Sequence, residues 1–249
     1  MLRVIVLLAA LVPAGAQWVH YPSPGVARTA DGKPNLAAPT PKTADGKPDL
    51  SGIWHVMDRR YLFDLATDVK EAPFQPWAAE QYKERLANMA KERPSGRCLP
   101  HMLTDAPLVA STVFKILQTP GLIAVLYEEM NHYRQIFTDG RKLPQPTTGA
   151  WFGYSVGHWD GDTLVVDTTG FNEKGWLDDP GHPHTEALHV IERYRRADVG
   201  HLQIQMTIDD PKAYTKPWSA TVPFELAADT ELIENICENE KDQDHLTHK

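Results

Sequence analysis

The residues best placed to do chemistry flank an Asp-Gly pair in the middle of the sequence. Residues 153–169 read GYSVGHWDGDTLVVDTT, two alternating runs that meet at Asp160-Gly161, which is the strongest local signal for a β-hairpin. A tight turn there sets a register in which Trp159 lies opposite Asp162, His158 opposite Thr163, Val156 opposite Val165 and Tyr154 opposite Asp167. Side chains alternate along a strand, so Tyr154, His158 and Asp167 share one face, which we expect to line a polar cavity.

These residue types suit general acid–base catalysis, because an imidazole titrates near neutral pH and a carboxylate can orient it. In this interpretation His158 moves the proton, Asp167 orients it and Tyr154 polarises a substrate oxygen. His184 and Glu186 would assist from a loop at the rim of the cavity. The alternative is an ordinary cross-strand hydrogen-bond ladder of Tyr154, His158 and Asp167.

A second concentration of polar residues lies at 176–194, which reads WLDDPGHPHTEALHVIERY. Three imidazoles and two carboxylates in so short a stretch can hold a divalent metal such as zinc, copper or iron. The ligands would be His182, His184 and His189, although His189 has the opposite strand parity and needs a bend to join the others. The prediction is a protein without a cofactor, and a divalent metal at these histidines is the alternative.

Four further side chains are candidates for substrate binding: Arg134, Trp176, Tyr214 and Trp218. The planar fork of Arg134 could hold a carboxylate or phosphate, and the aromatic rings could stack on a flat ligand. The competing interpretation is that Arg134 sits in a solvated hairpin end and that the aromatic residues are packing lids over loops.

The two cysteines allow one disulfide. We expect Cys98 to pair with Cys237, because a long closed loop constrains the unfolded chain of an exported protein considerably. Two separate buried thiols are the alternative.

The elements that would position these groups are mostly short strands. Runs rich in β-formers recur from residue 113 to residue 237, separated by turn signals, and predict strands at 113–118, 122–128, 133–138, 154–159, 163–168, 188–195, 202–208, 219–224 and 231–237. So many strands with short turns favour an antiparallel meander that is closed or curled into a barrel, with a two-sheet sandwich as the alternative. One amphipathic helix is predicted at about 77–93.

The ends of the chain predict export. Residues 1–16 combine an early arginine, a short apolar stretch and Ala-Gly-Ala, as in a secretory signal peptide. Residues 17–50 form an extended arm with two TADGKP repeats, residues 51–240 form one domain, and residues 241–249 form a polar tail. The net charge of −8 includes no basic cluster, so no nucleic-acid partner is expected, and no membrane anchor remains after signal cleavage. The oligomeric state is left open.

Two resemblances add to this reading. Gly52-Ile53-Trp54 resembles the Gly-x-Trp that opens lipocalin and related calycin barrels, and implies a tryptophan that plugs the closed end of a barrel. The strings DGKPDLSGIW and GHWDGDTLVVDTTGFN resemble those of a broad family of exported bacterial proteins, a likeness that brings no activity with it.

The sequence thus predicts an exported barrel that acts on a small organic molecule. It lacks the glycine-rich and serine-elbow signatures of nucleotide-binding proteins and serine hydrolases. The leading hypothesis is a lyase, isomerase or hydrolase that works by acid–base chemistry. The alternatives are a ligand-binding protein without catalysis and a histidine-ligated metalloprotein.

Overall fold

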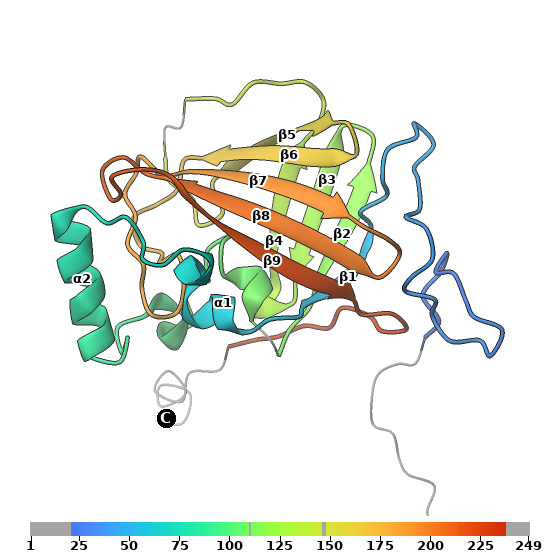
Figure 1. The fold of residues 1–249 in the computed structure, drawn as a ribbon, viewed down its shortest axis with the longest axis horizontal. Helices are drawn as coiled ribbons and strands as arrows, with labels where there is room; N and C mark the ends of the chain where they lie inside the picture. The colour runs from blue at the N-terminus through green and yellow to red at the C-terminus, as the bar shows by residue number, and fades with distance from the viewer. Residues whose placement is uncertain (1–20, 110, 146–147, 238–249) are drawn as a thin grey trace, which may run out of the picture.

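Nine strands close into a barrel in the computed structural model, which describes residues 21–109, 111–145 and 148–237 (Figure 1). The strands follow one another around the barrel in chain order: β1 (Gly52–Val56), β2 (Phe114–Thr119), β3 (Leu122–Tyr127), β4 (His132–Phe137), β5 (Tyr154–Asp160), β6 (Thr163–Thr169), β7 (His189–Arg196), β8 (His201–Asp209) and β9 (Trp218–Leu226). The predicted signal peptide and polar tail lie outside the described residues. The predicted barrel is confirmed, and the sandwich alternative is not found.

Each strand predicted between residues 113 and 224 is present within about two residues of its expected ends. The strand predicted at 231–237 is wrong, because these residues have no regular structure. The physical reason is closure: β1 pairs with β2 on one side and with β9 on the other, so no free edge remains for a further strand.

One neighbouring pair breaks the antiparallel pattern. In a closed ring with an odd number of strands the directions cannot all alternate, so one adjacent pair must run parallel. That pair is β4 and β5, which are joined through only Ile136 opposite Ser155 and Phe137 opposite Val156. The chain therefore returns along the barrel between the end of β4 and the start of β5 (Figure 1).

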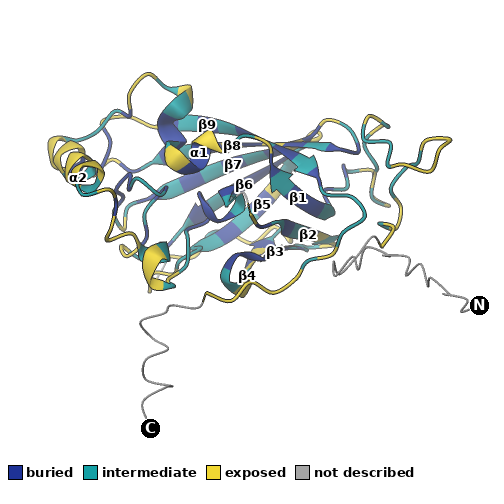
Figure 2. Ribbon diagram, turned by 90° about the horizontal axis from the view of Figure 1, so that it is seen from below, coloured by how far each residue is buried: buried dark blue, intermediate teal, exposed yellow. Residues whose placement is uncertain are grey.

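The core fills the barrel with the side chains of alternate residues. Inward-facing residues of β8 and β9 are buried, whereas their neighbours along each strand are less so (Figure 2). Trp54 is fully buried at one end of the barrel and donates from Nε1 to the carbonyl of Leu50 (3.1 Å). The guanidinium of Arg196 lies over the Trp54 ring at 4.9 Å and donates to the carbonyls of Asp49 and Ser51.

The two TADGKP repeats form the same turn twice. In each, the backbone N–H of the threonine donates to the carbonyl of the lysine four residues later, from Thr29 to Lys33 (2.9 Å) and from Thr43 to Lys47 (2.8 Å). The arm is extended and rich in turns as predicted, but it also packs against the barrel. Gly200 and Val199 in the β7–β8 turn donate to Leu36 (2.7 Å) and Ala38 (2.9 Å). The arm thus covers the Trp54 end of the barrel (Figure 1).

The helices lie at the opposite end of the barrel from the arm (Figure 1). They are α1 (Arg60–Phe63), α2 (Pro76–Ala87) and the short 3-10 turns η1 (Leu65–Asp68), η2 (Pro94–Arg97), η3 (Ala106–Leu108) and η4 (Glu129–Asn131). The predicted helix begins as expected but ends at Ala87, because Met89 and Ala90 adopt positive φ. No helix within the described residues is long and apolar enough to span a bilayer.

The predicted disulfide is confirmed. Cys98 and Cys237 are bonded, with their Cα atoms 5.5 Å apart and a sequence separation of 139. From β9 the chain runs back along the outside of the barrel to this bond, so the disulfide fixes Cys237 beside η2 (Figure 1).

Candidate functional site

The β5–β6 hairpin keeps the predicted shared face but not the predicted register. Asp160 pairs with Thr163, so the turn consists of Gly161 and Asp162, and Tyr154 lies opposite Thr169. The first turn position needs a positive φ, which Gly161 adopts at 61°, and Asp160 therefore joins the strand. The register differs from the prediction by two residues, and because two is even, Tyr154, His158 and Asp167 still share one face.

That face lies on the outside of the barrel, so the prediction that it lines a cavity is wrong. The inward-facing residues of the hairpin are Ser155, Gly157, Leu164, Val166 and Thr168, which are all buried. His158 is exposed, the Tyr154 hydroxyl accepts a hydrogen bond from Arg141 (3.0 Å), and the Asp167 carboxylate pairs with His189 Nε2 (3.0 Å). Burial of Leu164 and Val166 decides which face turns inward, because the barrel interior takes the more apolar set.

The other proposed catalytic residues do not join them. Glu186 is exposed and paired with Lys212. His184 is buried between two backbone carbonyls, with Nδ1 3.1 Å from Thr185 O and Nε2 3.1 Å from Gly175 O. The five residues proposed from the sequence therefore form no single site in the structure.

Arg134 lies inside the barrel rather than at a solvated hairpin end. Its guanidinium binds both oxygens of Glu192 and donates to Ser155 Oγ (2.9 Å) and Thr168 Oγ1 (2.8 Å). Burial alone would lower the pKa of Arg134, but the Glu192 carboxylate outweighs it and raises that pKa above its ordinary value. The guanidinium of Arg134 already makes its hydrogen bonds to side chains of the protein, so it is not available to a substrate.

The three histidines predicted as metal ligands do not converge. His189 lies on the outer face of β7 against Asp167, and both nitrogens of His184 are occupied by carbonyls. Burial lowers the pKa of His184 below its ordinary value. His182 is fully buried and pairs through Nδ1 with Asp178 Oδ2 (2.6 Å).

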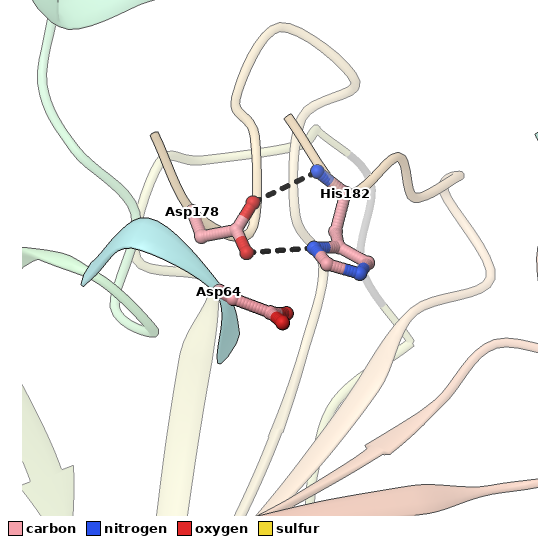
Figure 3. A group of neighbouring side chains, drawn as sticks. All are labelled: Asp64, Asp178 and His182. Atoms are coloured by element: carbon pink, nitrogen blue, oxygen red, sulfur yellow. Dashed lines mark hydrogen bonds and ion pairs between the residues drawn. The ribbon is translucent and has the colours of Figure 1, made fainter. Parts of the chain in front are cut away.

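Asp64, Asp178 and His182 offer ligand atoms that all lie within 4.8 Å of one another (Figure 3). Asp178, however, already accepts from the backbone N–H groups of Leu65 (2.8 Å), Gly181 (3.0 Å) and His182 (2.9 Å), as well as from the imidazole. Burial favours the neutral acid, but His182 and these donors outweigh it and hold the pKa of Asp178 below its usual range. With its oxygens saturated, this group fits a structural aspartate–histidine pair better than a metal centre.

The aromatic candidates serve mainly as packing. Tyr214 is buried and donates its hydroxyl to the carbonyl of Pro183 (2.8 Å), and the buried Trp218 ring lies 5.6 Å from the His182 ring. Trp176 stacks under the guanidinium of Arg85 (4.2 Å) and borders a cavity of about 10 Å³, which is the size of one water molecule. His101 borders this small cavity as well, so Trp176 lies close to the site described next.

The candidate site is a cavity of about 280 Å³ at the helix end of the barrel, which we call the His101 pocket. Three loops bring its ionisable groups together: His101 lies between η2 and η3, Glu129 in η4, and Asp179 between β6 and β7. The remaining lining residues are Leu62, Arg93, Ser95, Val109, Ser111, Thr112, Met130, Asn235 and Cys237. The segment around the disulfide-bonded Cys237 therefore forms one wall of the pocket.

His101 lies between two carboxylates. Its Nδ1 is 2.8 Å from Glu129 Oε1 and its Nε2 is 3.4 Å from Asp179 Oδ1, and we call Glu129, His101 and Asp179 the His101 row. Burial alone would lower the pKa of His101, but Asp105, Asp179 and Glu129 outweigh it and raise that pKa to about 10. Both ring nitrogens therefore carry protons at neutral pH, and the row consists of a cation between two anions.

Two features of the His101 row are typical of a functional site. The second carboxylate oxygen of Glu129, Oε2, is buried without a hydrogen-bond partner among the described residues, which is costly for a charged group. The turn that carries Glu129 also contains two non-glycine residues with positive φ, Met130 at 47° and Asn131 at 54°. Backbone conformations of this kind persist only where the surroundings enforce them, and they cluster at binding and catalytic sites.

A carboxylic acid lies behind the row. Burial, against the attraction of His101, raises the pKa of Asp105 to about 8. Its Oδ1 accepts from the backbone N–H of Met102 (2.7 Å), which fixes the loop that carries His101. The pKa values of His101 and Asp105 both lie well above their ordinary values, and such shifts are typical of functional sites.

A second cavity, of about 240 Å³, lies under the arm at the Trp54 end. Arg196 borders it, but its guanidinium is occupied by the backbone carbonyls of Asp49, Ser51, Asp198 and Val199. The His101 pocket is therefore the better candidate, because its polar groups retain unused hydrogen-bonding capacity.

The fold and the His101 pocket together define a β-barrel with a polar cavity at one end. Comparison of the chain with protein-family models, with curated proteins and with solved structures finds no match in any of the three. The geometry of the pocket therefore carries the functional argument alone.

Proposed function

We propose that this protein is exported and binds a small polar molecule in the His101 pocket, without a cofactor. The observation that carries the proposal is Glu129, which lines the cavity and has one carboxylate oxygen buried without a partner among the described residues. A bound molecule that donates a hydrogen bond would compensate the cost of that oxygen, and since the oxygen is itself buried, binding requires the Glu129 carboxylate to turn towards the cavity. The cavity, at about 280 Å³, is near the lower end of the range for small-molecule sites.

Thermal unfolding of the purified protein against a panel of small metabolites tests this proposal. We expect certain members of the panel to raise the melting temperature, and His101→Gln and Glu129→Gln to remove the effect. His158→Ala, at the exposed face of the hairpin, should leave it intact. Stabilising compounds that act equally on the pocket variants and on the wild type would disprove binding in the His101 pocket.

Acid–base catalysis by the same pocket is the second candidate, and the shifted pKa values of His101 and Asp105 favour it. In that case Glu129 would accept a proton from the substrate while His101 holds its other oxygen. The reaction would be that of a lyase, isomerase or hydrolase. A compound from the panel that is converted to product by the wild type and is bound without conversion by Glu129→Gln would distinguish catalysis from binding alone.

Export is supported by the sequence of residues 1–16 and by the disulfide between Cys98 and Cys237, since disulfides persist in oxidising compartments. Expression of the full chain in a bacterial host should give periplasmic protein whose first residue is Gln17. Cytoplasmic protein that retains residues 1–16 would contradict this part of the proposal.

A further inference from the structure

We infer that the molecule bound in the His101 pocket carries an ammonium group, which donates hydrogen bonds to Glu129 and Asp179. This inference rests on the proposed function, because it specifies the ligand class of the same pocket. Three properties of the pocket lead to it: the charge of the His101 row, the spare acceptor capacity of its carboxylates, and the character of the other walls.

The charge of the row favours a cation. Two carboxylates flank one imidazolium, so the three side chains of the row carry a net charge of −1 while His101 is protonated, and the only other charged residue among the described residues that line the pocket is the half-exposed Arg93, 3.8 Å from Asp179. All three are largely buried, with exposed fractions of 11% for His101, 5% for Glu129 and 16% for Asp179. In such a setting solvent screens charges weakly, and an anion would meet two carboxylates at close range.

The acceptors of the row are not saturated. Glu129 Oε2 has no partner among the described residues. Asp179 is held loosely, at 3.4 Å from His101 Nε2 and 3.8 Å from Arg93 Nη1. Arg93 is almost half exposed, so it can move aside without a large desolvation cost. An ammonium group has three donors and no acceptor, which matches a pocket with two partly free carboxylates.

The remaining walls limit the rest of the ligand. Leu62, Val109 and Met130 supply apolar contacts, and Ser95 and Thr112 supply hydroxyl groups. The cavity volume of about 280 Å³ leaves room for a short carbon chain beside the ammonium group. The ligand class is therefore a small primary amine rather than a sugar acid or a nucleotide.

The experiment is an NMR titration of the intact, oxidised protein with four probes, followed through the imidazole signals of His101. Propylamine, protonated at neutral pH, supplies charge and N–H donors, whereas tetramethylammonium supplies charge alone. 1-Propanol supplies a donor without charge, and acetate is the anionic control. We expect saturable shifts with propylamine, affinities at least about tenfold weaker for the other cation and for propanol, and no binding of acetate.

Substitutions in the pocket test whether propylamine binds at the His101 row. Glu129→Gln keeps the shape of the side chain but removes its charge, and should weaken propylamine binding by about tenfold or more. Asp179→Asn should act in the same direction, and provides the test if the first variant fails to fold. Glu80→Gln, on the exposed side of α2, is the matched control and should change nothing.

Each outcome decides the inference. Propanol or acetate binding as tightly as propylamine at His101 would overturn the ammonium class while leaving the binding function in place. The absence of any shift at His101 with propylamine would overturn the inference as well. Failure of the binding function itself has a different signature, because stabilising metabolites would then be insensitive to the pocket variants.

Discussion

Arg134 and Glu192 form an ion pair in the middle of the barrel that is almost completely removed from water. Both side chains are 2% exposed, and the pair is surrounded by Ser155, Thr168 and the hydroxyl of Tyr194, which donates to Glu192 Oε1 (2.8 Å). Burial raises the pKa of Tyr194 well above its ordinary value, so this phenol remains a donor. Every polar atom of the pair thus has a partner inside the protein.

Removal of one partner should be costly. Arg134→Met leaves Glu192 charged and unpaired in the core, so we expect a loss of about 3 to 5 kcal/mol in the free energy of unfolding in urea. Arg134→Met combined with Glu192→Leu should recover much of that loss, because no isolated charge remains. Arg141→Met removes an exposed pair with Asp139 and should cost less than about 1 kcal/mol. Equal effects of the two arginine substitutions would contradict the interior position of Arg134.

The His101 pocket makes stability fall as the pH rises through neutrality. Acidic neighbours raise the pKa of His101 from 6.5 to about 10 against the effect of burial, so its stabilising contribution is complete below pH 6.5 and is lost towards pH 10. Burial raises the pKa of Asp105 from 3.8 to about 8, so the folded protein holds a proton that the unfolded chain releases, and stability again falls between these values.

Together the two groups should lower the free energy of unfolding by roughly 3 kcal/mol between pH 6.5 and 8. Urea unfolding at a series of pH values measures this slope. His101→Gln and Asp105→Asn should each reduce this slope, and because each group shifts the pKa of the other, the two reductions are not expected to add. A slope that is the same in both variants and in the wild type would show that other groups control it.

At the scale of elements, the disulfide links the residue that follows η2 to the segment that follows β9. Between β9 and Cys237, Ile233 N donates to Glu128 Oε1 (3.0 Å) and Asn235 N donates to Asn131 Oδ1 (3.2 Å). Glu128 directly precedes η4 and Asn131 is its last residue, so the segment after β9 and the turn that carries Glu129 support each other.

Replacement of both cysteines by serine tests this link. On the chain-entropy model a closed loop of 139 residues contributes roughly 5 kcal/mol, so we expect a loss of this order in the free energy of unfolding. Hydrogen exchange should accelerate at residues 233–237, and chemically reduced wild-type protein should behave like the variant. Unchanged exchange in this segment would mean that the two hydrogen bonds hold it without the disulfide.

The elements themselves could be predicted well from the sequence, but their inward faces could not. Alternation identified β5 and β6 and grouped Tyr154, His158 and Asp167, yet alternation is symmetric between the two faces of a strand. The inward face is chosen by packing against the rest of the barrel, which a local pattern does not contain. The same limit explains the strand predicted at 231–237, since only closure of the barrel excludes it.

The candidate site could be predicted even less, because it is assembled from distant loops. His101 is 28 residues from Glu129 and 78 residues from Asp179, and none of the three lies in a regular strand. Of the groups considered from the sequence, the polar stretch 176–194 contains one member of the row, Asp179, and the predicted disulfide brings the loop before His101 to the same region. The spacing of His101, Glu129 and Asp179 in the sequence does not predict that they lie together in the fold.

At the scale of the whole molecule, Arg196 joins the arm to the barrel. Its guanidinium donates to carbonyls of Asp49 and Ser51 and to carbonyls of Asp198 and Val199 in the β7–β8 turn. Burial lowers the pKa of Arg196 to about 10, which still leaves it charged at neutral pH. A single side chain thus satisfies backbone groups of two separate segments.

Arg196→Met should therefore release the arm. We expect a loss of about 2 to 4 kcal/mol in the free energy of unfolding, because several buried carbonyls lose a charged donor. Limited trypsin digestion should cut faster after Lys42, which precedes Thr43, in the variant. Arg195→Met, at the neighbouring exposed position of β7, is the control and should alter neither measurement.

The parallel contact between β4 and β5 has a consequence for how the molecule moves. Only two residue pairs hold these strands together, whereas β7 and β8 share eight. Transient opening of the barrel should therefore begin between β4 and β5, beside the inward-facing Arg134 and Ser155. Such an opening would admit water to the Arg134–Glu192 ion pair from the side of the barrel. In native-state amide exchange, protons at Phe137 and Val156 should be lost well before those of Ile204 and Val222.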